Sequence, residues 1–182
     1  MRKALCLLGL LFLVSVSAAA QDSSKIDMFA GYSFLHTGPG IATSSFNANG
    51  GVGSIALNVT SWASIVAEVG GIHVSSINGT DVDGTAMTYM LGPKISPFRL
   101  GKFSPFVQVL AGVTHTTPGF NQTTFNAYTL AISPGAGLDW NATRHLAIRL
   151  GQIDYLLTRI PTSTNQVTWN NFRYSTGIVL RF

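Results

Sequence analysis

The sequence predicts an all-β fold, an eight-stranded antiparallel up-and-down transmembrane β-barrel, and three observations support this prediction. Hydrophobic residues make up 46% and charged residues only 10% of the 182 residues, whereas a water-soluble domain usually carries about 25% charged residues. After residue 20, no apolar run is long enough for a membrane-spanning helix. Apolar and polar residues instead alternate with a period of two in eight segments, the pattern of strands that cross a bilayer.

Residues 1–20 have the pattern of a secretory signal peptide. Arg2 and Lys3 precede an apolar run, and three alanines at 18–20 supply the small residues of a cleavage site. The run is short for a spanning helix, so we expect cleavage before Gln21 and a barrel domain over residues 21–182. Cys6, the single cysteine, leaves with the signal peptide, so disulfides are excluded from the mature chain.

The first four predicted strands cover residues 26–35, 51–59, 62–74 and 85–95. Successive side chains of a strand point to opposite faces, so each strand has one apolar face and one polar or small face. The third strand, for example, places Ile65, Ala67 and Val69 on one face and Glu68 on the other. The second strand is rich in glycine and alanine, and its alternation is less regular.

The last four predicted strands cover residues 104–115, 125–138, 144–157 and 170–182. The final strand alternates up to its last residue. The seventh strand needs a change of parity, because Leu150 and Ile153 both belong to the apolar face. A β-bulge near Gly151 would shift the alternation by one residue and keep Arg149 and Asp154 on the polar face.

The connections between the predicted strands alternate in length. Longer loops are expected at residues 36–50, 75–84, 116–124 and 158–170, and short turns at 60–62, 96–103 and 139–143. Outer-membrane barrels have long external loops, short periplasmic turns and, with an even strand number, both chain ends in the periplasm. The alternation therefore indicates an up-and-down barrel with its short turns in the periplasm.

The polar face distinguishes a membrane barrel from a soluble one, because a soluble barrel carries its charges outside and a membrane barrel carries them inside. The predicted interior polar network consists of Asp27, Glu68, Lys94, Arg149, Asp154, Arg173 and Arg181. Seven charges are too few to cover a soluble exterior, but inside a barrel they can pair. Since the interior of eight strands is just wide enough for side chains, we favour a plugged interior; a narrow water path is the alternative.

Aromatic residues gather near both ends of the predicted strands. Near the short turns lie Trp62, Phe98, Phe103, Trp140 and Phe182, and near the longer loops lie Tyr32, Phe34, Tyr128, Tyr155 and Phe172. Two aromatic girdles on either side of an aliphatic band are typical of membrane interfaces.

The end of the chain carries the most specific motif. Residues 176–182 resemble the C-terminal assembly signal of bacterial outer-membrane proteins through Thr176, Gly177, Leu180 and Phe182. With the stretches "HLAIRLGQIDYLLTR" and "NNFRYSTGIVLRF", the mature chain is similar to the small OmpA/OmpX-like outer membrane β-barrel family. The resemblance implies an eight-stranded barrel in the outer membrane of a Gram-negative bacterium, inserted by the outer-membrane assembly machinery. It does not extend to a peptidoglycan-binding domain, for which the sequence leaves no room.

No catalytic, cofactor-binding or metal-binding residue is expected, because the histidines are scattered and the mature chain lacks cysteine. His73 and Ser75 resemble the His-x-Ser pair of some outer-membrane lipid A deacylases. That chemistry needs an acidic group to orient the imidazole. However, Glu68 is predicted to face the interior, and Asp81 and Asp83 fall in a predicted loop.

We therefore expect a non-enzymatic protein with a structural, envelope-integrity or surface-interaction role. Its expected partners are the lipid bilayer and, during biogenesis, the assembly machinery; the sequence does not identify a ligand of the loops. The alternatives are a lipid-modifying enzyme at His73 and Ser75, and a narrow channel. A nucleic-acid partner is not expected, because removing Arg2 and Lys3 lowers the net charge from +4 to +2 and leaves no cluster of basic residues.

Overall fold

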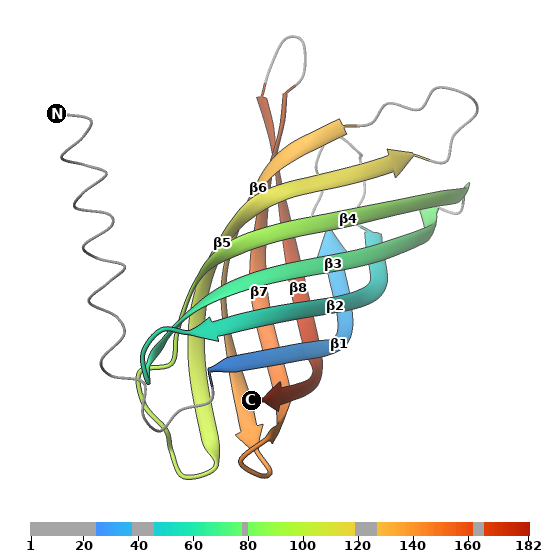
Figure 1. Ribbon diagram of the computed structural model, residues 1–182. Helices are drawn as coiled ribbons and strands as arrows, with labels where there is room; N and C mark the ends of the chain where they lie inside the picture. The colour runs from blue at the N-terminus through green and yellow to red at the C-terminus, as the bar shows by residue number, and fades with distance from the viewer. Residues whose placement is uncertain (1–24, 38–45, 78–79, 119–126, 162–165) are drawn as a thin grey trace, which may run out of the picture.

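The structure, a computed structural model of the chain, describes residues 25–37, 46–77, 80–118, 127–161 and 166–182. Eight strands follow one another along the chain and wrap into a barrel (Figure 1). Their bounds are β1 Ile26–Thr37, β2 Phe46–Asn58, β3 Ala63–Ile77, β4 Thr80–Ile95, β5 Phe103–Pro118, β6 Ala127–Asn141, β7 Leu146–Pro161 and β8 Gln166–Arg181. The signal peptide predicted at residues 1–20 lies outside the described residues and stays a prediction.

The sheet closes on itself. Each strand pairs antiparallel with the next, and β8 returns to pair with β1. The β1–β8 register begins with Asp27 opposite Arg181. One step beyond, the backbone N–H of Ile26 donates to the carbonyl of Phe182 at 3.1 Å, and the N–H of Phe182 donates back at 2.9 Å. Closure pairs the edges that an open sheet would expose, and it confirms the predicted eight-stranded up-and-down barrel.

The strands are longer than the sequence pattern indicated. β3 and β4 together occupy most of the predicted loop 75–84, and β7 and β8 occupy much of the predicted loop 158–170. β6 likewise continues to Asn141, through part of the turn expected at 139–143. The predicted loops were inferred from runs of polar side chains and glycine. Strand pairing is made by backbone groups, so it continues where the apolar alternation stops.

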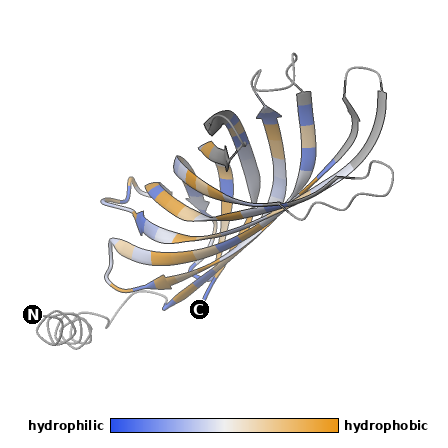
Figure 2. Ribbon diagram, turned by 90° about the horizontal axis from the view of Figure 1, so that it is seen from above, coloured by the Kyte–Doolittle hydropathy of each residue, from blue (hydrophilic) through white to orange (hydrophobic). Residues whose placement is uncertain are grey.

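The alternation of side chains agrees with the predicted parity. In β5, Val107 and Val109 face outward and are each 51% exposed, whereas Gln108 and Leu110 are buried inside the barrel. Orange and blue segments follow each other along the strands in Figure 2. The outer wall is therefore lined by aliphatic and aromatic side chains. The described residues contain no helix with the length and apolar character that a bilayer span requires.

The predicted bulge in β7 is confirmed. The register with β8 shifts between Arg149 and Gln152, and the register with β6 shifts opposite the same place. Leu150 is exposed and Gln152 is fully buried, so the parity changes across Gly151. The hydroxyl of Tyr174 donates to the carbonyl of Leu150 at 2.9 Å, which satisfies a backbone group that the bulge takes out of the ladder.

Two turns at one end of the barrel have the same construction. The hydroxyl of Thr60 accepts a hydrogen bond from the backbone N–H three residues later at 2.9 Å, and the hydroxyl of Thr143 does the same at 3.1 Å. Such side-chain bonds favour tight turns. We call this end, at the bottom of Figure 1, the short-turn end; it contains connections 59–62, 96–102 and 142–145. The opposite end is the loop end.

We predict that alanine at Gly31 or Gly177 impairs closure of the barrel, because these two glycines face each other across the β1–β8 seam. A Cβ atom at Gly31 would lie 2.1 Å from the carbonyl oxygen of Thr176, and one at Gly177 would lie 2.3 Å from that of Ala30. Both variants should yield less folded barrel, measured by heat-modifiable gel migration after refolding into lipid vesicles. Gly53→Ala is the control, since a Cβ atom at Gly53 would lie 3.7 Å from its nearest neighbour, the carbonyl oxygen of Phe29. Equal yields of folded barrel for all three variants would contradict this prediction.

Candidate functional site

Charged side chains fill part of the barrel interior. The structure buries all seven residues of the predicted network, each at most 9% exposed: Asp27, Glu68, Lys94, Arg149, Asp154, Arg173 and Arg181. An eighth, Asp139, is buried beside them. Among the described residues, the interior thus contains four basic and four acidic side chains, and their formal charges cancel.

Arg173 of β8 binds two carboxylates from two other strands. Its Nη2 donates to Oδ2 of Asp154 at 2.8 Å and to Oε1 of Glu68, and its Nε donates to the same Asp154 oxygen at 3.1 Å. Asp154 also accepts hydrogen bonds from Gln152 at 2.7 Å and from Gln108 at 3.3 Å. Side chains from β3, β5, β7 and β8 therefore meet around this one guanidinium group.

Arg149 of β7 lies between two aromatic rings. Its guanidinium carbon is 4.1 Å from the ring centroid of Phe29 and 4.5 Å from that of Phe106, which is cation–π geometry. Its Nε donates to Oδ1 of Asp139 at 2.8 Å, and its Nη1 donates to Oε1 of Gln152 at 2.6 Å. The rings thus cover the faces of the guanidinium group while its edge makes hydrogen bonds.

Arg181 of β8 joins the interior charges to the short-turn end. Its guanidinium nitrogens lie 3.6 Å from Oδ2 of Asp27 and 3.6 Å from Oδ2 of Asp139, and Nη1 donates to Oδ1 of Asn141. Asn58 donates to Asp27 at 3.1 Å. The asparagines that end β2 and β6 therefore turn their amides inward to the same charges.

Together these contacts form one continuous interior chain of polar side chains. In order it consists of Glu68, Arg173, Asp154, Gln152, Arg149, Asp139, Arg181 and Asp27. The structure brings six of the seven predicted residues into this chain. Lys94 stands beside it: within the described residues it makes no ion pair, and its Nζ lies 5.6 Å from the ring centroid of Phe106.

Sequence reasoning missed three of the residues that hold this chain. Asp139 was placed in a turn, and Phe29 and Phe106 were not assigned to the interior. Parity would have located all of them: Phe29 lies two residues after Asp27, and Phe106 two residues before Gln108, on the same faces. Extending β6 by the same rule puts Asp139 inside as well. The aromatic girdles were predicted for the outer wall of the barrel, and they do not include Phe29 or Phe106.

Apolar side chains fill another part of the lumen, which corrects the expectation of a polar or small inner face. The buried cluster comprises Leu35, Ala48, Ala56, Val66, Met90, Leu110, Ala131 and Leu156. Two cavities border the interior polar residues, one of about 40 Å³ beside Lys94 and Arg181 and one of about 20 Å³ beside Ser33 and Arg173. Each has room for about one to three water molecules.

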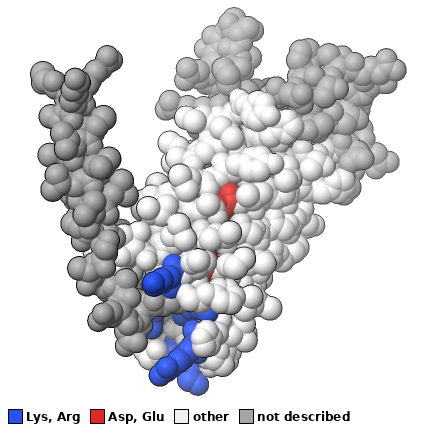
Figure 3. All heavy atoms as spheres, in the orientation of Figure 1, with Lys and Arg blue, Asp and Glu red and all other residues white. Residues whose placement is uncertain are grey.

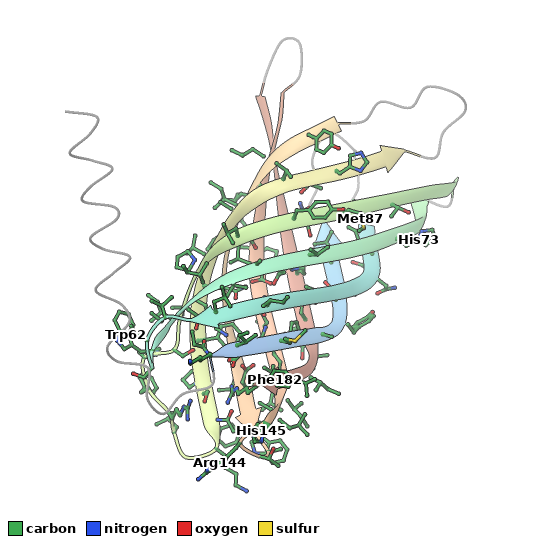
Figure 4. The ribbon with its side chains drawn as sticks, viewed as in Figure 1. Trp62, His73, Met87, Arg144, His145 and Phe182 are labelled. Atoms are coloured by element: carbon green, nitrogen blue, oxygen red, sulfur yellow. The ribbon has the colours of Figure 1, made fainter. Side chains whose placement is uncertain are left out.

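His73 and Glu68 lie on opposite faces of β3. His73 is exposed on the outer wall towards the loop end (Figure 4), whereas Glu68 is buried inside and bound to Arg173. The side chain of Ser75 lies outside the described residues, as do those of Asp81 and Asp83. Within the described part of the chain, no group of three or more His, Cys, Asp or Glu residues is placed to hold a metal ion.

The four residues of the C-terminal motif take different places in β8 and its end. Thr176 donates from its hydroxyl to the carbonyl of Arg149 at 2.8 Å, next to the bulge. Gly177 lies at the β1–β8 seam. Leu180 and Phe182 point outward and are 44% and 62% exposed.

We predict that Arg173→Met lowers the free energy of unfolding of the inserted barrel by about 3–5 kcal/mol, because it leaves buried carboxylates without their cation. Urea unfolding in lipid vesicles, followed by tryptophan fluorescence, measures the change. The double variant Glu68→Gln/Arg173→Met should recover part of the loss. Lys25→Met, at an exposed basic residue, is the control; an equal, small effect of Arg173→Met and Lys25→Met would show that the interior ion pairs are not needed.

Comparison with solved structures agrees with the barrel fold. Neisserial surface protein A is 8% identical, with a TM-score of 0.68 over 89% of this chain and 100% of that one. The N-terminal β-barrel domain of OprF from Pseudomonas aeruginosa is 14% identical, with a TM-score of 0.60 over 88% and 100% of the two chains. The attachment invasion locus protein Ail of Yersinia pestis is 13% identical, with a TM-score of 0.55 over 87% and 99%. At these identities the likeness shows the fold alone.

The sequence itself gives the family. No curated protein matches the chain. Residues 6–182, nearly the whole sequence, match the family described as the outer membrane protein β-barrel domain. The closed eight-stranded barrel, its apolar outer wall and its charged interior agree with that match. The chain belongs to the outer membrane protein β-barrel domain family.

Proposed function

We propose that this protein is a closed barrel of a Gram-negative outer membrane, with a structural role in the envelope and an interaction surface at its loop end. The observation that carries this proposal is the interior: an ion-paired chain and an apolar cluster occupy the lumen between the walls. In this arrangement the short-turn end faces the periplasm, as in other barrels of this kind.

The exposed residues of the outer wall favour a lipid bilayer as the surroundings of the barrel. Exposed aliphatic side chains cover its middle, as at Val69, Val109 and Ile132. Exposed aromatic residues of the predicted girdles lie towards both ends: Trp62, Phe98, Phe103 and Phe182 at one end, and Tyr32, Tyr128 and Phe172 towards the other. Trp62 and Phe182 are labelled near the short-turn end in Figure 4. Aromatic residues at these two levels are suited to the headgroup regions of a membrane.

The filled interior favours a structural role over transport. Gln152 joins the ion pairs around Arg173 to those around Arg149, so side chains from several strands meet in the lumen. A solute would have to displace buried charges from their partners, which costs several kcal/mol for each uncompensated ion. The role in surface interaction is supported by the orientation of the barrel, in which the connections at the loop end face outward from the cell. The name of one solved barrel of this fold, attachment invasion locus protein, is consistent with such a role.

We predict that the folded protein does not conduct ions in planar lipid bilayers. Heat-modifiable migration of the same sample shows that the barrel is folded, and a general porin serves as the positive control. Discrete conductance steps from the folded, purified protein would contradict the plugged interior and favour the narrow channel.

We also propose that the outer-membrane assembly machinery reads Thr176, Gly177, Leu180 and Phe182 during insertion. Deleting Phe182 should slow insertion by purified assembly machinery, because the outward aromatic residue is lost from the closing strand. It should change the urea stability of barrels already inserted much less, since Phe182 is 62% exposed. Equal insertion rates for the truncated and full chains would refute this proposal.

A further inference from the structure

Among the residues whose side chains the structure describes, the exposed charges are all basic and all at one end of the barrel. Inside, the four basic and four acidic side chains that the structure describes as buried balance. Outside, every charged side chain that the structure describes as exposed is basic, namely Lys25, Arg99, Lys102 and Arg144. All four lie at the short-turn end, where Figure 3 shows basic side chains gathered on the visible face. None of them is ion-paired to an acidic residue in the described part of the chain.

Three of these four exposed basic side chains border one open cleft. It has a volume of about 490 Å³ and lies between the β4–β5 turn and the β6–β7 turn. Arg99 and Lys102 line it from the first turn, Arg144 and His145 from the second, and Arg181 and Phe182 from the end of β8. Arg144, His145 and Phe182 are grouped at the lower end of Figure 4. The cleft therefore collects cationic side chains from three segments that are distant in the sequence.

The backbone fixes the walls of this cleft. Leu100 and Phe103 exchange two hydrogen bonds, at 2.8 and 3.0 Å, around the two-residue turn Gly101–Lys102. The N–H of Asn141 donates to the carbonyl of Lys102 at 2.7 Å and ties this turn to the end of β6. Lys102 is thus presented at the tip of a hydrogen-bonded turn, a position set by main-chain contacts.

Apolar side chains alternate with the cations in the same turn. Residues 98–103 read Phe-Arg-Leu-Gly-Lys-Phe, and Phe98, Leu100 and Phe103 are 54%, 63% and 42% exposed. This mixture suits a boundary where phosphate groups and acyl chains meet, because aromatic and aliphatic side chains enter the hydrocarbon while basic ones reach the headgroups. A fully aqueous partner such as a cell-wall glycan would leave these apolar side chains in water.

We propose that the cleft between the β4–β5 and β6–β7 turns binds the headgroup of an anionic phospholipid in the leaflet at the short-turn end. This inference rests on the membrane placement under the proposed function. Arg99, Lys102 and Arg144 bind the phosphate, and Phe98, Leu100 and Phe103 contact the upper acyl chains.

Native mass spectrometry of the folded mature chain in detergent tests this proposal, with phosphatidylglycerol and phosphatidylcholine of matched acyl chains as the probes. The wild type should bind phosphatidylglycerol more tightly. Each of Arg99→Gln and Arg144→Gln should weaken phosphatidylglycerol binding about fivefold, the effect of one basic residue near an anionic lipid surface. Phosphatidylcholine binding should stay unchanged, and the charge-conserving Arg144→Lys should keep most of the affinity.

Arg159→Gln is the matched control, because it removes the same charge from β7 at the loop end. Equal affinity for the two lipids, or equal losses in Arg144→Gln and Arg159→Gln, would overturn the proposal. So would wild-type binding to purified cell-wall sacculi that depends on Arg144, without preference between the lipids. Failure of the wild type to insert into vesicles as a heat-modifiable barrel would instead refute the proposed function, so the two failures are distinguishable.

Discussion

The structure depends most on the ion pairs inside the barrel. Eight of the charged side chains that the structure describes are enclosed by a wall whose outer surface is apolar. A charge in such a place is costly unless it is paired and hydrogen-bonded. Arg173 can meet Glu68 and Asp154 only if β3, β7 and β8 keep their parity and the barrel is closed. A slip of one residue in any of these strands would turn a charge towards the lipid. The interior chain of polar side chains therefore favours one pairing register of the strands, in addition to contributing ion pairs and hydrogen bonds.

The bulge in β7 serves the same requirement. Arg149 and Asp154 are five residues apart, so an uninterrupted strand would place them on opposite faces. The extra residue at the bulge brings both inside, where Gln152 bonds to each of them. Its outer side is stabilised by Tyr174 and Thr176 of β8, which donate to the carbonyls of Leu150 and Arg149. Thr176 of the C-terminal motif thus has a structural contact in the finished barrel as well as its proposed part in assembly.

Period-two alternation was sufficient to predict the fold class, the order of the strands and the bulge, because the bilayer and the lumen impose opposite solvents on the two faces. It was insufficient for strand ends, since β3 and β4 remain hydrogen-bonded through a polar stretch that resembles a loop. It also left Phe29 and Phe106 unassigned, although they share faces with Asp27 and Gln108. Inside the barrel their rings cover the guanidinium group of Arg149. The pairing of acidic with basic side chains depends on the curvature of the barrel and the stagger of its strands. The alternation within a single strand does not determine either of them.

The ion pairs of Arg173 can be observed directly in a membrane. Solid-state NMR of the folded chain in lipid bilayers, with labelled arginine guanidinium nitrogens and labelled side-chain carboxyl carbons, measures the dipolar coupling between them. We expect strong coupling of the Arg173 guanidinium group to the carboxyl groups of both Glu68 and Asp154. A guanidinium group that exchanges magnetisation with bulk water and couples to neither carboxylate would contradict it.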